Sequence, residues 1–146
     1  MKANRAKAIV IGTVLAGGAA VAVLSSTAPA VAFSSGGLTL EVTPLSPGTL
    51  VAKGAAVDVP VDVECNASFA DLTLQLTERV GGQIATGSTD VSVACNGGHQ
   101  RLLVRVPATS GKPFSKGSAV ATASIFGCNR TTCGQESNSV TIQITR

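Results

Sequence analysis

The residues that could do chemistry are few, and His99 is the first of them. It is the only histidine in the 146-residue sequence, and it follows an Asn96-Gly97-Gly98 turn. No serine or cysteine nucleophile stands at a recognised spacing from it, and no GxSxG, HExxH, phosphate-loop or dinucleotide-binding motif occurs. A Ser-His-Asp site can also assemble in space without such a mark. The simpler interpretation is a solvated turn residue, so we expect no catalytic residue, no cofactor and no enzyme.

A second group with possible chemistry is a set of carboxylates on one predicted strand. Asp58, Asp62 and Glu64 fall on the same face of a strand with alternating polarity. Carboxylate oxygens are the ligands that Ca²⁺ prefers. Such charges are more often the solvated face of a half-buried strand, and we expect no metal here.

The first thirty residues have the three-part plan of a secretory signal. Lys2, Arg5 and Lys7 give a positive start, residues 8–24 are apolar, and small residues follow up to position 32. An A-x-A cleavage motif occupies residues 30–32, and another occupies residues 28–30. An uncleaved membrane anchor is the alternative, although seventeen apolar residues are marginal for a core of roughly 30 Å. We therefore expect residues 1–32 to be a cleaved signal peptide and residues 33–146 to be one secreted or envelope domain.

Removal of that segment changes the charge balance. The whole chain carries a net charge of +3, but three of its eleven basic residues lie in the predicted signal. The remainder has eight basic and eight acidic residues and is formally neutral. Nucleic-acid binding depends on neutralising phosphates, and attraction to a membrane depends on basic patches. We expect neither partner after cleavage.

Four cysteines in an exported chain indicate two disulfides. They are Cys65, Cys95, Cys128 and Cys133, and three pairings are possible. Four residues between Cys128 and Cys133 suit a hairpin tip that a disulfide can bridge, so we favour that pair and, with it, Cys65 with Cys95. A zinc site would need a better ligand spacing than one C-x4-C and two distant cysteines.

The elements that must position these residues are strands. Apolar side chains alternate with polar ones over residues 38–42, 57–65, 72–76, 91–95, 100–106 and 140–144. Gly87 predicts a bulge, Pro60 predicts a bulge or an unpaired side, and Asn96-Gly97-Gly98 predicts a hairpin. About seven strands in roughly a hundred residues favour an immunoglobulin-like antiparallel β-sandwich. A small barrel is the second choice.

An up-and-down arrangement would bring all four cysteines to one end of the sandwich. Loops at one end of this fold commonly carry binding residues. Turns also need asparagine and glycine for their backbone alone, so these loops need not bind anything. The candidate binding residues are Asn66, Ser68, Asn96, His99, Asn129, Arg130, Thr131 and Thr132.

Several segments resemble exported actinobacterial domains with no assigned activity. The similar segments are "VEC", "LTLQLTERVGGQIATGS", "VSVAC", "GCNRTTC" and "VTIQI". The chain also resembles, more faintly, the neocarzinostatin-type antibiotic-binding apoproteins, which have two disulfides, one of them in a C-x4-C hairpin. Their other disulfide closes a shorter loop than Cys65 to Cys95 would, and this chain lacks the aromatic residues expected in a chromophore cleft. The resemblance implies an immunoglobulin-like fold and transfers no ligand.

These observations favour a non-enzymatic, monomeric binding or structural protein that uses the loops beside the cysteines. Its partner would be a protein, an envelope component or a small molecule. One alternative is a secreted protease inhibitor with Arg130 in the exposed loop. Another is a small-molecule carrier of the antibiotic type, and a hydrolase would need a pocket around His99.

Overall fold

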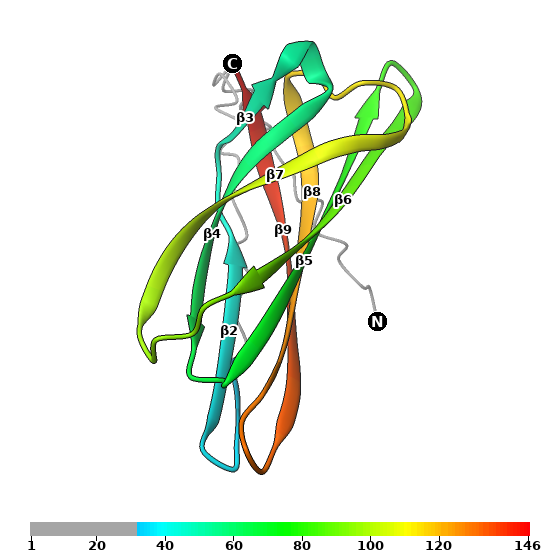
Figure 1. Ribbon diagram of the computed structural model, residues 1–146. Helices are drawn as coiled ribbons and strands as arrows, with labels where there is room; N and C mark the ends of the chain where they lie inside the picture. Colours follow the sequence, from blue (N-terminus) through cyan, green and yellow to red (C-terminus); the bar gives the residue numbers. More distant parts are fainter. Residues whose placement is uncertain (1–31) are drawn as a thin grey trace, which may run out of the picture.

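The computed structural model describes residues 32–146, which form a single all-β unit (Figure 1). The predicted signal peptide lies outside these residues except for its last position. One 3₁₀ turn, η1 (Ala52–Gly54), interrupts the strands. The strands are β1 (Phe33–Ser35), β2 (Leu38–Pro44), β3 (Gly48–Val51), β4 (Ala56–Cys65), β5 (Phe69–Val80), β6 (Gln83–Val93), β7 (His99–Gly111), β8 (Gly117–Cys128) and β9 (Cys133–Thr145).

β4 illustrates why these residues form strands. Val57, Val59 and Val61 are fully buried, and the residues between them point outward and are half-buried. Burying a valine side chain contributes roughly 1.5–3 kcal/mol, so a slip of one residue would expose the whole apolar row. The alternation therefore fixes the register as well as the strand.

Pro60 is accommodated without a bulge. β4 pairs with β7 from Ala56 to Glu64 without a shift in register. On its other side β4 pairs with β3 up to Asp58 and with β2 from Val61 onward. Pro60 lies between these two ladders, and its carbonyl accepts a hydrogen bond from the amide of Leu45. The Pro60 nitrogen therefore points to a gap between β3 and β2, where no ladder hydrogen bond is needed. This agrees with the predicted unpaired side.

Seven strands close into a ring. In order of hydrogen bonding they are β4, β3, β9, β8, β5, β6 and β7, and β7 returns to β4. β2 lies outside this ring and pairs with the C-terminal half of β4, from Val61 to Cys65, and β1 pairs with β2. The molecule is thus a seven-stranded barrel with two additional strands.

The expected immunoglobulin-like β-sandwich is therefore wrong. Two short ladders join what would be separate sheets: β3 pairs in parallel with β9 at Gly48–Ile144 and Thr49–Thr145, and β6 pairs with β7 at three positions. Alternating polarity shows which side chains face the core, but it carries no information on which strand edges pair. The closure depended on those edges.

The expected hairpin at Asn96-Gly97-Gly98 does not form either. β6 and β7 pair only at the far end, where Ala85, Thr86 and Gly87 meet residues 108–111. Near the turn, the Cys65–Cys95 disulfide and a hydrogen bond from the Gly97 amide to the Cys65 carbonyl tie the connection to β4. The long partner of β7 is consequently β4 and not β6.

The predicted irregularity at Gly87 is confirmed. The β6–β7 register shifts between Thr86 and Gly87. A Cβ atom at Gly87 would overlap the Pro107 carbonyl oxygen and approach Val106 Cγ1 to 2.9 Å. A residue without a side chain is therefore required where these two strands meet.

Candidate functional site

The two disulfides lie at one end of the barrel. Cys65 pairs with Cys95, and Cys128 pairs with Cys133, which is the pairing that the sequence favours. We call this end the disulfide pole and define it by the connections at residues 36–37, 66–68, 94–98 and 129–132. In Figure 1 it is the lower end, where the β8–β9 hairpin projects, and the C-terminus lies at the upper end.

Asn66 braces two connections of the disulfide pole. Its Oδ1 accepts a hydrogen bond of 2.8 Å from the Thr39 amide, and its Nδ2 donates one of 2.8 Å to the Gly37 carbonyl. The β4–β5 connection is thereby fastened to the β1–β2 turn. Ser68 adds a third tie, because its amide donates to the Cys128 carbonyl at 2.8 Å.

Asn129 shapes the tip of the β8–β9 hairpin. Its Oδ1 accepts hydrogen bonds from the amides of Thr131 and Thr132, at 3.0 and 2.8 Å, and from the Thr131 hydroxyl. The Asn129 amide donates to the Thr132 carbonyl at 2.9 Å, which closes the turn. Asn96 does the same on a smaller scale, since its Oδ1 accepts from the Gly98 amide. These asparagines hold loops in shape, as turn residues commonly do.

Arg130 is the one basic residue among the predicted loop residues 66–68, 96 and 129–132. It is exposed at the hairpin tip, and within residues 32–146 its side chain makes no hydrogen bond or ion pair. Asn129, Thr131 and the adjacent disulfide fix the backbone on either side of it. The disulfide pole therefore presents one cationic side chain on a rigid support.

Sequence reasoning missed a pair of exposed phenylalanines at the same end of the barrel as Arg130. Phe69 and Phe126 are 50% and 42% exposed, and their ring centroids lie 6.1 Å apart at a tilt of 56°. Phe69 pairs directly with Cys128 in the β5–β8 ladder. A signal was available, because the alternation of both strands places these phenylalanines on the outward face with Asp71 and Ser124.

His99 opens β7 and lies on the outer face. Its Nε2 is 2.9 Å from Glu64 Oε2, and its side chain is 77% exposed. A shallow hollow of about 410 Å³ beside it is lined by Asp62, His99, Gln100 and Arg101. That lining offers no hydroxyl or thiol nucleophile for the hydrolase alternative.

The predicted carboxylate face is a ladder of ion pairs. Arg105 donates to both carboxylate oxygens of Asp58, at 2.7 and 2.9 Å, and Arg101 does the same to Asp62. The hydrogen bonds from these guanidinium groups lower the pKa of both aspartates below the usual value. In the part of the chain that the structure describes, no three acidic, histidine or cysteine side chains are arranged to hold a metal ion.

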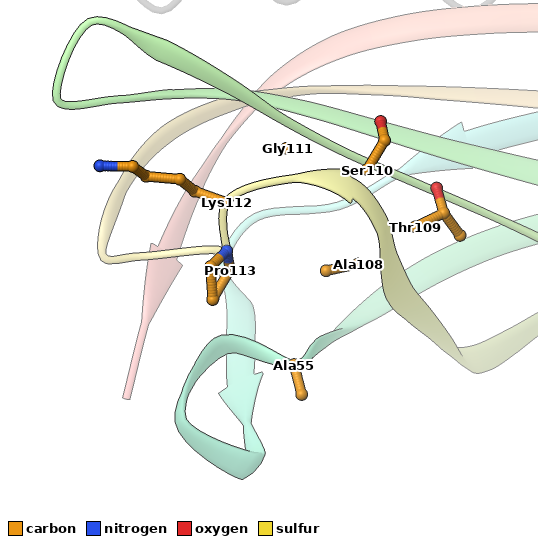
Figure 2. A pocket seen from close by; sticks show the side chains of 7 residues that line it. All are labelled: Ala55, Ala108, Thr109, Ser110, Gly111, Lys112 and Pro113. Atoms are coloured by element: carbon orange, nitrogen blue, oxygen red, sulfur yellow. The ribbon is translucent and has the colours of Figure 1, made fainter.

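Two cavities lie at the other end of the barrel. One of about 290 Å³ lies between Ala55 and the β7–β8 connection, and Figure 2 shows the residues that line it, which are mostly small apart from Lys112. The other, of about 600 Å³, lies beside η1 and the same connection. Its lining residues are Leu50, Lys53, Phe114, Ser115, Lys116 and Arg146.

No family model matches this chain, and no curated protein is significantly similar to it. Among residues 32–146, no helix is long and apolar enough to cross a membrane. The two disulfides suggest an oxidising compartment, either extracellular or in the cell envelope.

Proposed function

We propose that this protein is an exported, non-enzymatic binding protein of the extracellular space or cell envelope, and that it contacts its partner through the disulfide pole. The observation that carries the proposal is the exposure of Arg130 and of the Phe69–Phe126 pair on the same disulfide-braced end, where Phe69 pairs with Cys128. Arginine often dominates binding energy in interfaces, and phenylalanine is enriched at interfaces relative to the rest of the surface.

The rigidity of this surface supports the proposal. Ordering a flexible side chain or loop on binding costs about 0.5–1.5 kcal/mol per immobilised side chain. At the disulfide pole, Asn66, Asn129 and the two disulfides already hold the loop backbones in place. Less freedom is therefore lost when a partner docks.

The shape of the surface favours a large partner. Arg130, Phe69 and Phe126 line none of the three cavities described above. An enclosed small molecule would bury most of its surface in such a cavity. A protein or a polymeric envelope component with an acidic group therefore fits these residues better.

The protease-inhibitor alternative receives less support from the loop geometry. Arg130 is exposed beside a disulfide, which favours it, but the hydrogen bond from Asn129 to Thr132 folds the loop into a tight turn. Pairing with another chain in the manner of an added strand needs an extended backbone. An assay of trypsin with micromolar purified protein tests the alternative directly, and we expect no inhibition.

The proposal is tested with purified, secreted protein and isolated cell envelopes of its own source. We expect Arg130→Ala and Phe69→Ser to reduce retention on the envelopes at least tenfold, the loss of roughly 1.4 kcal/mol or more expected for dominant interface residues. Ile84→Ser is the matched control, because Ile84 is equally exposed, at 50%, next to the β5–β6 turn at the opposite end. Equal retention of all three variants and the unmodified protein would refute the disulfide pole as the binding surface.

Export is tested on the same material. Mass spectrometry of the secreted protein should give the mass of a chain that begins directly after residue 30 or residue 32. Reduction should add the mass of four hydrogens, one pair for each disulfide. A full-length chain in the cytoplasm would contradict the proposal.

A further inference from the structure

The larger cavity opposite the disulfide pole is lined by cationic side chains from three separate parts of the chain. Lys53 comes from η1, Lys116 from the β7–β8 connection and Arg146 from the end of the sequence. All three are exposed, and none takes part in an ion pair within the described residues. Lys53 and Lys116 lie in connections that are held at both ends by the fold, whereas Arg146 follows the last strand, β9. The two lysines are therefore the cationic groups considered below. We call this cavity the cationic pocket.

The floor of the cationic pocket is apolar. Leu50 is half-buried and Phe114 is 3% exposed, and both line the cavity of about 600 Å³. A few charged groups around an apolar floor are the usual make-up of a small-molecule site. A ligand that suits both parts has an anionic end and an apolar end.

The backbone beside the cationic pocket is held in an unusual conformation. Ala52 and Lys53 have φ angles of 48° and 58°, in the left-handed region that costs residues with side chains roughly 1–2 kcal/mol. The next residue, Gly54, lies against the Phe114 backbone, where a Cβ atom would overlap the Phe114 carbonyl oxygen. The Phe114 amide also donates to the Gly54 carbonyl at 2.9 Å. The turn that carries Lys53 is thus locked to the loop that carries Lys116.

A buried carboxylate holds that loop from beneath. Glu78 is 3% exposed and accepts hydrogen bonds of 2.8 Å from both the amide and the hydroxyl of Ser115. With its oxygens bonded to Ser115, Glu78 fixes the residue that immediately precedes Lys116. The carboxylate and the strained turn together hold the backbone that carries the two lysines before any ligand arrives.

We propose that the cationic pocket binds a small amphipathic anion, with its carboxylate, phosphate or sulfate group between Lys53 and Lys116 and its apolar part against Leu50 and Phe114. The placement supports this because Lys53 and Lys116 line one cavity without an ion pair in the described residues, and an anion between two like charges is attracted to both. The site is separate from the disulfide pole and does not depend on the function proposed there.

The test uses isothermal titration of the purified, secreted protein with octyl phosphate. Octyl glucoside has the same tail without the charge, and inorganic phosphate has the charge without the tail. We expect octyl phosphate to bind at least tenfold more tightly than either, and to bind more weakly as salt is raised from about 0.05 to 0.5 M because the contacts are screened.

Variants locate the site. Lys53→Gln and Lys116→Gln should each weaken octyl phosphate binding about fivefold to tenfold, since each removes one charge-assisted contact. Lys112→Gln is the matched control, because Lys112 lies in the same connection but is not among the residues that line the cationic pocket. Thermal melting checks that the variants fold. The proposal is overturned if octyl phosphate does not bind at millimolar concentration, or if all three variants bind it alike.

Vesicles distinguish the two sources of such an anion. Flotation with phosphatidylglycerol vesicles that is lost in Lys53→Gln assigns the anionic group to a lipid headgroup. Binding of octyl phosphate without flotation assigns it to a soluble amphiphile. Flotation that is unchanged in Lys53→Gln would contradict the cationic pocket as the site.

Discussion

At the scale of single residues, the polar side chains of this barrel divide into those that bond within the protein and those that remain free. Asn66, Asn129 and Glu78 use their polar atoms on neighbouring backbone, whereas Arg130, Lys53 and Lys116 form no ion pair in residues 32–146. In the sequence both groups are simply polar residues. Only the structure separates the residues that hold loops from those available to a partner.

Glu78 gives a direct test of this division. Replacement with alanine removes both acceptors of Ser115 and leaves its amide unsatisfied in a half-buried loop. We expect Glu78→Ala to lower the free energy of unfolding by about 1–3 kcal/mol, measured by urea denaturation. Glu78→Gln keeps one acceptor and should cost less. Equal stability of Glu78→Ala and the unmodified protein would show that the loop does not depend on this carboxylate.

The ion pairs on the β4–β7 face predict a pH dependence. Their arginines lower the folded-state pKa of Asp58 and Asp62, whereas an unfolded aspartate titrates near about 3.9. A lowered folded pKa stabilises the protein above the unfolded value, and this stabilisation disappears as the pH falls through the folded value.

Arg101→Gln/Arg105→Gln isolates that effect. The double variant should be less stable than the unmodified protein at pH 7, and the difference should shrink as the pH falls below about 4. Asp58 should contribute more than Asp62, because its side chain is 15% exposed against 39%. Urea denaturation at a series of pH values measures both. A difference that stays constant down to pH 2 would contradict the prediction.

At the scale of the elements, alternating polarity was sufficient to place most strands. The apolar positions predicted in residues 57–65 and 72–76 are buried in β4 and β5, and the bulge at Gly87 is present. β1 and β3 were missed because three or four residues are too few to show a period. The ladder between β4 and β7 was missed because it joins strands that are not consecutive in the chain.

The junction of β6 and β7 predicts a sensitive glycine. In Gly87→Ala the new methyl group would meet the Pro107 carbonyl and Phe114 Cζ, the latter at 3.1 Å. We expect a loss of about 1–3 kcal/mol, the usual cost of overpacking. Gly98→Ala is the control, since the nearest atom to its Cβ is Asn96 Oδ1 at 3.6 Å. Denaturant unfolding of both variants measures the contrast, and a similar stability for the two would count against the close packing at Gly87.

The disulfides predict two different costs. Cys65–Cys95 joins residues 30 apart and Cys128–Cys133 joins residues 5 apart. The loss of chain entropy in the unfolded state then gives about 3.6 kcal/mol for the first and about 2 kcal/mol for the second. Cys65→Ala/Cys95→Ala should therefore be the less stable double variant in urea denaturation. The reverse order would show that loop length does not govern these contributions.

At the scale of the whole molecule, the location of the cysteines could be predicted but the charged end could not. The cysteines could be placed because Cys65, Cys128 and Cys133 lie at strand ends and Cys95 lies two residues beyond the end of β6. Lys53, Lys116 and Arg146 are separated along the chain by whole strands, and their meeting depends on how the barrel closes. A formally neutral composition concealed this local concentration of positive charge.

The closed ring also bears on association. An open sheet edge invites pairing with another chain. In this barrel the ladders between β3 and β9 and between β6 and β7 join strands that would otherwise be sheet edges. The outermost strand, β1, has only three residues. We expect a monomer at micromolar concentration in light scattering with size exclusion. A stable dimer would contradict this expectation. If Ser34→Pro then prevented its formation, β1 would be identified as the interface.

The parallel ladder between Gly48–Thr49 and Ile144–Thr145 has a consequence for how the chain folds. Gly48 and Thr49 lie near the start of the described domain, whereas Ile144 and Thr145 lie about a hundred residues later. A chain that is released N-terminus first therefore cannot complete the ring until Ile144 and Thr145 have been released. Long-range closures of this kind are slow, with all-β domains folding in milliseconds to seconds. Cys65 and Cys95 both emerge well before that point and can already be linked. A chain delivered across a membrane from its N-terminus could thus be cross-linked first and would become a barrel only after residues 144 and 145 have crossed.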